Sequence, residues 1–155
     1  MRKLFWTITH VIALFIGFGL GIYMLPILTA PPSPDSAALE ESAAEALYTA
    51  EFTRELRGSD FLHWGEGTVS VTPTQIVHEG SLAPGPDYKL YLMKSFVEHE
   101  DQFDAAVGDA VLIGDVKTFD GLILPVPEGV DVAEFNTVLI WCESFSEFIT
   151  AAQYQ

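Results

Sequence analysis

Residues 138–148 read VLIWCESFSEF, and this stretch decides how the rest of the chain is interpreted. It contains the only cysteine of the protein, Cys142. Successive side chains of a strand point to opposite faces, which divides the first five residues into two sets: Val138, Ile140 and Cys142 on one face, and Leu139 and Trp141 on the other. A strand that is apolar on both faces is typical of a central, covered strand. We therefore expect Cys142 near the end of a central strand.

The chain before this stretch contains further short strands separated by turns. Residues 68–72 alternate with a period of two, and Pro73 marks the turn to a returning strand at 74–79. Strands are also predicted at 88–93, 110–116 and 122–126, and residues 96–104 form an acidic loop or a short helical piece. Short strands at this spacing, with no helical crossover, predict an all-β fold, namely an antiparallel β-sandwich or a jelly-roll-like domain.

The N-terminal segment predicts a membrane anchor. No charged side chain occurs in residues 4–30, and Arg2 and Lys3 precede them. About 20 apolar residues cross a bilayer core, so residues 4–29 suffice to contact the lipid bilayer across its thickness. An uncleaved signal-anchor is favoured over a cleaved signal peptide, because Leu28 stands where a cleavage site needs a small residue. The positive flank stays in the cytoplasm. The C-terminal domain is then periplasmic or extracellular, on a single-pass anchor in the inner or plasma membrane.

Composition divides the chain into three segments. Residues 1–30 form a cytoplasmic stub and the transmembrane signal-anchor. Residues 31–53 form a Pro-rich linker and a spacer helix, because proline cannot continue a helix and residues 35–51 are rich in alanine and glutamate. Residues 54–155 form the β domain.

Two glycines of the anchor, Gly17 and Gly21, stand four residues apart. This spacing lets two helices approach closely and could support a homodimer. Glycine is also common in membrane helices without any such role.

The charge of the protein is strongly acidic, with a formal net charge of −15. All 22 acidic residues follow residue 30, where five lysines and arginines leave a net charge of −17. This charge excludes nucleic acid as a partner, since that binding depends on cations that meet phosphates. Solubility is the simplest role for such a surface, and cation binding or docking to a basic partner is the alternative. A single cysteine allows no internal disulfide.

Cys142 is the candidate reactive atom, and two interpretations of it remain open. A functional cysteine acts as a thiolate, which nearby cations favour, whereas here Glu143 and an acidic domain oppose it. Free cysteine is also among the most buried residue types. His63 could meet Cys142 in space as a mixed sulfur and nitrogen ligand set for haem iron, copper or zinc. No zinc motif, phosphate loop or hydrolase signature accompanies them.

Three stretches together resemble the DM-thirteen domain. RGSDFLHWGEGTV at 57–69 looks like its opening, GPDYKLYL at 85–92 is similar to its Gly-Pro-Asp motif with the following strand, and VLIWCESF at 138–145 matches its closing Trp-Cys signature. The resemblance covers about residues 54–153. It implies an extracytoplasmic β-rich domain, often found beside DOMON domains, that takes part in electron transfer. The cysteine of the family, here Cys142, would be a bare redox thiol or a ligand to a prosthetic group such as haem.

The function predicted from these observations is a redox role centred on Cys142 in a membrane-anchored extracytoplasmic domain. Haem and copper are the candidate cofactors, with Cys142 and His63 as ligands, and a cofactor-free thiol is the equal alternative. A redox protein is the expected partner. The competing hypothesis is a non-catalytic cell-surface binding module in which Cys142 is structural. A third hypothesis, a calcium-dependent adhesion or carbohydrate-binding sandwich, depends on the acidic loop at 96–104.

Overall fold

The strand that carries Cys142 lies inside a four-stranded antiparallel sheet. The computed structural model describes residues 1–155. β7 (Thr137–Cys142) is buried along all of its length and pairs with β4 (Tyr88–Met93) on one side and β8 (Glu147–Gln153) on the other. β5 (Val111–Val116) completes the sheet, whose strand order is β5-β4-β7-β8. The prediction of a central, covered strand is therefore confirmed.

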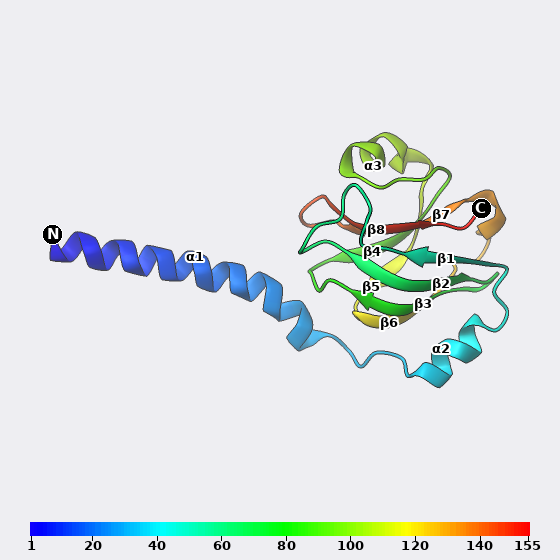
Figure 1. The fold of residues 1–155 in the computed structure, drawn as a ribbon, viewed down its shortest axis with the longest axis horizontal. Coiled ribbons are helices and arrows are strands. Elements are labelled where there is room, and N and C mark those ends of the chain that lie inside the picture. The colour runs from blue at the N-terminus through cyan, green and yellow to red at the C-terminus, as the bar shows by residue number, and fades with distance from the viewer.

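A second antiparallel sheet packs against the first. Its order is β1-β2-β3-β6, formed by β1 (Tyr48–Phe52), β2 (Gly65–Val71), β3 (Gln75–Leu82) and β6 (Asp120–Pro125). Both sheets contribute to one core of 19 buried residues. Two four-stranded antiparallel sheets around a shared core agree with the predicted β-sandwich (Figure 1).

The sheet of β7 is covered on its outer face as well. Seven further buried residues form a separate cluster there, under α3 (Glu100–Ala106) and beside the short 3-10 helix η1 (Val107–Asp109). Leu139 and Trp141 belong to this outer cluster, whereas Cys142 belongs to the core between the sheets. The predicted division of the strand between its two faces is thus correct. The helix α3 begins within residues 96–104, which were predicted as a loop or short helical piece, and extends two residues beyond them.

The predicted spacer helix over residues 35–51 is wrong in its second half. The helix α2 is only Ser36–Ala43, with the Asp35 carboxylate accepting the Ala38 N–H at 2.9 Å as its N-cap. Residues 48–52 instead form β1, which pairs with β2 and places Phe52 in the core. The first strand therefore lies before residue 54, and α2 packs on the outer side of β3 and β6 rather than standing free (Figure 1).

β8 is the second element that the sequence analysis missed. A short turn after Cys142 leads into it, and Ser146 adopts a φ of 54° there. A positive φ is uncommon for a residue other than glycine or asparagine, and those two residues mark a hairpin turn in a sequence. Because a serine takes this conformation here, the sequence contains no hairpin signal. A second short helix, η2 (Val132–Glu134), precedes β7.

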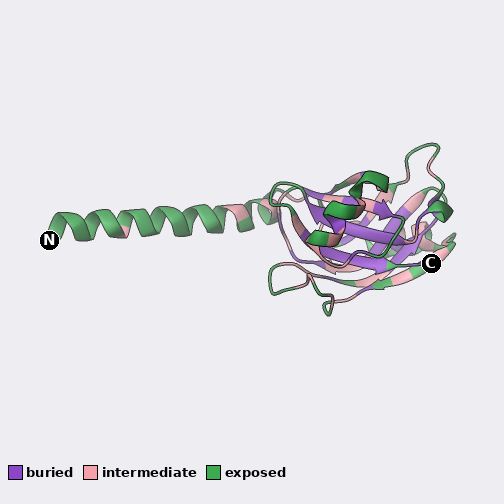
Figure 2. Ribbon diagram, turned by 90° about the horizontal axis from the view of Figure 1, so that it is seen from above, coloured by how far each residue is buried: buried purple, intermediate pink, exposed green.

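The N-terminal helix α1 (Arg2–Thr29) projects away from the sandwich (Figure 1). None of its 28 residues is buried, and Figure 2 shows most of its length as exposed. It is long and apolar enough to cross a membrane, as an anchor or a signal sequence would be. A Cβ atom added at Gly17 or Gly21 would meet nothing within 4 Å, so this face of the helix is open.

Candidate functional site

The Cys142 thiol lies between the two sheets, at the end of β7, with the residue only 3% exposed. Its Sγ donates a hydrogen bond to the Pro86 carbonyl oxygen at 3.1 Å, and Tyr88 on β4 is its direct cross-strand partner. Burial raises the pKa of the Cys142 thiol, and the negative charges of Asp87 and Glu147 add to this effect. The group therefore rests as a neutral thiol at neutral pH.

The Gly85-Pro86-Asp87 loop is tied to the end of β7 through Asp87. The Asp87 carbonyl oxygen accepts the Glu143 N–H at 3.1 Å, and its carboxylate accepts the Ser144 hydroxyl at 2.8 Å. Lys89 Nζ lies 3.2 Å from the other carboxylate oxygen. The Ser144 hydrogen bond and the Lys89 charge hold the pKa of Asp87 below its ordinary value. Asp87 thus joins the loop to the residues that follow Cys142.

Gly85 allows the loop to lie close to Tyr88. A Cβ atom at this position would be 2.6 Å from Cζ of the Tyr88 ring, so a larger residue would force the two apart. Tyr88 is 3% exposed, and burial raises its pKa. The close approach keeps the Pro86 carbonyl within reach of the Cys142 thiol.

His63 lies in the loop before β2, two residues ahead of the strand start at Gly65. Asp60 fixes this loop, because its Oδ1 accepts the N–H groups of Leu62 and His63 at 2.6 and 2.8 Å. Its Oδ2 lies 3.1 Å from Nδ1 of the His63 ring. Nδ1 is therefore engaged and Nε2 is the nitrogen left for another partner. A carboxylate on one ring nitrogen is the usual way in which a ligating histidine is oriented.

Asp60 is a site residue that the sequence analysis did not identify. Burial alone would raise the pKa of Asp60, but the hydrogen bonds from Leu62 and His63 together outweigh it and lower that pKa. The signal in the sequence is weak, since an aspartate three residues before a histidine is common in turns. Only the fold shows that its second oxygen reaches the ring.

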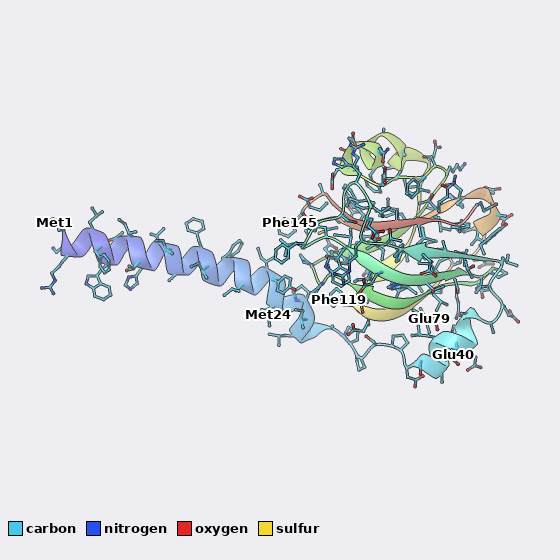
Figure 3. The ribbon with its side chains drawn as sticks, viewed as in Figure 1. Met1, Met24, Glu40, Glu79, Phe119 and Phe145 are labelled. Atoms are coloured by element: carbon cyan, nitrogen blue, oxygen red, sulfur yellow. The ribbon has the colours of Figure 1, made fainter.

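Cys142 and His63, from distant parts of the chain, line one cavity of about 420 Å³. This volume is in the range of small-molecule sites. Pro84, Gly85 and Pro86 form part of its wall, and most of its lining is apolar. The helix α1 closes another side with Gly19, Ile22 and Tyr23. Figure 3 labels Phe145, which lines this cavity, at the end of the sandwich that faces α1.

The other histidines of the β domain lie away from this cavity. His78 is fully buried, with Nε2 3.0 Å from the Glu66 carbonyl oxygen, and burial lowers its pKa. His99 pairs with Glu100 and Asp101 at the start of α3. No group of three histidine, cysteine or acidic side chains is placed to hold a metal ion, in the acidic segment or elsewhere.

Cys142 and His63 are the cysteine and the histidine that line the cavity, and Glu147 is its one carboxylate. Copper and zinc sites take three or four protein ligands, which this chain does not bring together. A haem iron takes only one or two axial ligands from the protein, and one histidine with one cysteine matches that number.

A comparison with protein families identifies the β domain. The model of the family described as electron transfer DM13 matches residues 55–154. The chain belongs to the DM13 family. No curated protein and no solved structure matches it.

The three stretches that carry the DM13 resemblance meet in the structure. His63 from the first, Gly85 and Pro86 from the second and Cys142 from the third all line the same cavity. Trp141 of the third stretch does not, because it packs under α3.

Proposed function

We propose that this chain is an electron-transfer protein of the DM13 family, anchored by α1 outside the plasma or inner membrane, with the Cys142–His63 cavity as its redox site. The observation that carries the proposal is the meeting of the three DM13 stretches at one cavity. The anchor is supported by the length of α1: 28 residues measure roughly 42 Å at 1.5 Å per residue, more than the roughly 30 Å of a hydrocarbon core.

His63 and Cys142 have separate tasks in this proposal. Asp60 holds Nδ1 of His63, so Nε2 is the atom that binds. Cys142 supplies Sγ, which a bound iron would convert to a thiolate despite the raised pKa, since a coordinating thiol loses its proton. Cys142 and His63 would hold a haem, which would supply reversible one-electron chemistry. The apolar lining would exclude water from the group and so influence its potential.

One observation favours a different function. Cys142 is buried, its thiol donates a hydrogen bond to the Pro86 carbonyl oxygen, and burial raises the pKa of that thiol. These are the properties expected of a cysteine that only fills a core. In that case the domain is a binding module on the cell surface and the cavity takes a ligand without redox chemistry.

The test uses the full-length chain, produced with its anchor in an oxidising compartment and purified in detergent. We expect a visible absorption band and bound iron that are lost in Cys142→Ala and His63→Ala. His99→Ala is the matched control, because His99 also pairs with carboxylates but lies away from the cavity. A colourless, metal-free protein whose thiol reacts only after unfolding would rule out the cofactor-bound redox site.

A further inference from the structure

Three large apolar side chains are exposed at the end of the sandwich where the cavity opens. Phe61 is 87% exposed, Leu62 42% and Phe145 50%. Phe61 and Leu62 lie in the loop between β1 and β2, and Phe145 lies in the turn between β7 and β8. Scattered apolar side chains on a surface are normal. These three, however, come from two loops that frame one cavity, which both Leu62 and Phe145 line. We refer to Phe61, Leu62 and Phe145 as the apolar rim.

The position of α1 gives the level of the apolar rim relative to a membrane. Gly19, Ile22 and Tyr23 line the same cavity as Leu62 and Phe145. If the hydrocarbon core begins at Leu4, roughly 20 residues bring its outer boundary to Tyr23. Gly19 lies about 6 Å below that boundary, at 1.5 Å per residue. The rim is thus at the depth that amphipathic surface segments reach, about 5–10 Å into the interface.

We propose that the apolar rim rests in the outer leaflet of the lipid bilayer, so that the cavity of Cys142 opens at lipid level. The inference depends on the proposed anchor, because α1 sets the height of the sandwich above the membrane. Ile22 of α1 and the exposed side chains of Leu62 and Phe145 line the same cavity, so its mouth is apolar on both the helix side and the loop side. Molecules dissolved in the membrane have direct access to the cavity, whereas molecules dissolved in water do not.

The charges around the rim determine which lipid suits it. Asp60 pairs with His63, Asp87 pairs with Lys89, and Glu143 accepts the Tyr91 hydroxyl. Glu147 lines the cavity, and the residues after position 30 carry a net charge of −17. An anionic lipid surface would repel this domain. The rim should therefore insert into zwitterionic lipid and withdraw as anionic lipid is added.

Spin labels on the full-length chain test the proposal. In a Cys142→Ala background, labels are placed through Phe61→Cys and Phe145→Cys, and the chain is reconstituted in phosphatidylcholine vesicles. Leu47→Cys is the control: Leu47 is 58% exposed, but its N–H bonds to Val71, at the end of β2 far from the rim. We expect the labels at positions 61 and 145 to collide with oxygen and to lose collisions with a water-soluble nickel complex. Collisions equal to those at position 47 would overturn the proposal.

A second measurement leaves Cys142 in place. Phe61→Trp adds a tryptophan to the rim, and brominated phosphatidylcholine should quench it beyond the quenching of the native chain. Phosphatidylglycerol mixed into the vesicles should reduce this extra quenching. Flotation of the vesicles separates the two proposals. A chain that does not float refutes the anchor and the rim together, whereas a chain that floats with an unquenched Phe61→Trp refutes the rim alone.

Discussion

The two faces of β7 pack against different parts of the molecule. The outer face, with Leu139 and Trp141, lies under α3 in a separate cluster that does not line the Cys142 cavity. The inner face, with Val138, Ile140 and Cys142, belongs to the core between the sheets and ends at the cavity. The adjacent residues Trp141 and Cys142 therefore belong to different layers. The difference teaches that the tryptophan of the DM13 signature packs α3 onto the sheet, while the cysteine is presented to the site.

The largest difference in stability between the two faces is expected from Trp141→Ala. Trp141 is 3% exposed and stacks on Phe103 of α3, with ring centroids 4.0 Å apart and an angle of 18° between the planes. Removing a buried aromatic side chain costs about 3–5 kcal/mol of unfolding free energy. Urea unfolding of the full-length chain in detergent measures this loss. Phe145→Ala, at an exposed aromatic three residues beyond the cysteine, should change stability by less than about 0.5 kcal/mol. Equal losses in both variants would remove the distinction between the two layers.

The second-largest loss of stability is expected where Asp87 joins the Gly85-Pro86-Asp87 loop to the residues after β7. Asp87→Ala removes the hydrogen bond to Ser144 and the ion pair with Lys89. It also places alanine at a φ of 54°, which aspartate and asparagine tolerate better. We expect a loss of about 1–2 kcal/mol, on the scale of a hydrogen bond to a charged group. Asp87→Asn keeps the backbone preference and should recover about half. An unchanged urea midpoint in Asp87→Ala would mean that the loop holds itself in place.

The Asp87→Ala substitution should also make the Cys142 thiol more accessible. Because the loop carries the Pro86 carbonyl that accepts the thiol hydrogen bond, a displaced loop exposes the sulfur. Thiol reagents should then modify Cys142 faster in Asp87→Ala than in the native chain. A variant that is less stable but equally slow to react would show that Asp87 does not control the inner face.

The fold was predictable where the pattern of side chains is unambiguous. Residues 138–142 gave the central strand and the correct faces, because a strand apolar on both sides has few other places in a sandwich. β1 was missed because its sequence, YTAEF, continues an alanine- and glutamate-rich segment, and pairing with β2 overrides that helix preference. β8 was missed because the turn at Ser146 uses a positive φ without glycine.

The site was predictable only in its two named residues. The resemblance to DM-thirteen indicated Cys142, the residue pattern suggested His63 as its partner, and the structure brings both to one cavity. Their roles as ligands stay a prediction. The orienting role of Asp60 and the contribution of Ile22 and Tyr23 depend on how loops and α1 are placed in space, which a one-dimensional pattern does not contain.

The third effect is a pH dependence of the unfolding free energy, which we expect from a histidine in the core between the sheets. His78 faces the core, with its ring 5.1 Å from that of Phe52, and burial lowers its pKa. The unfolded chain takes up a proton on this histidine below pH about 6.5 while the folded chain does not, so stability is full above that pH and falls as the pH decreases. We expect a loss on the order of 1 kcal/mol between pH 6.5 and 5.5, since one proton contributes at most about 1.4 kcal/mol per pH unit.

Urea midpoints across this pH range measure the effect, and two variants locate it. His78→Gln should flatten the dependence, whereas His99→Gln, which changes a histidine beside α3 on the outer side, should leave it in place. A slope that disappears with His99→Gln instead would assign the pH sensitivity to the outer layer and reverse the comparison.

The smallest effect on stability is expected from Cys142→Ser, although this is the residue on which the proposed function depends. The serine hydroxyl can donate to the Pro86 carbonyl as the thiol does, at 3.1 Å in the native chain, so no buried acceptor is left unpaired. The cost should be about 1 kcal/mol or less, the desolvation of a slightly more polar group. The redox site, however, should be lost, because oxygen does not replace sulfur as a soft ligand or as a redox atom. Urea unfolding and a visible spectrum of the same sample separate the two quantities. If Cys142→Ser destabilises the chain as much as Trp141→Ala, the cysteine is a packing residue like its neighbour, and the two faces of β7 serve one structural purpose.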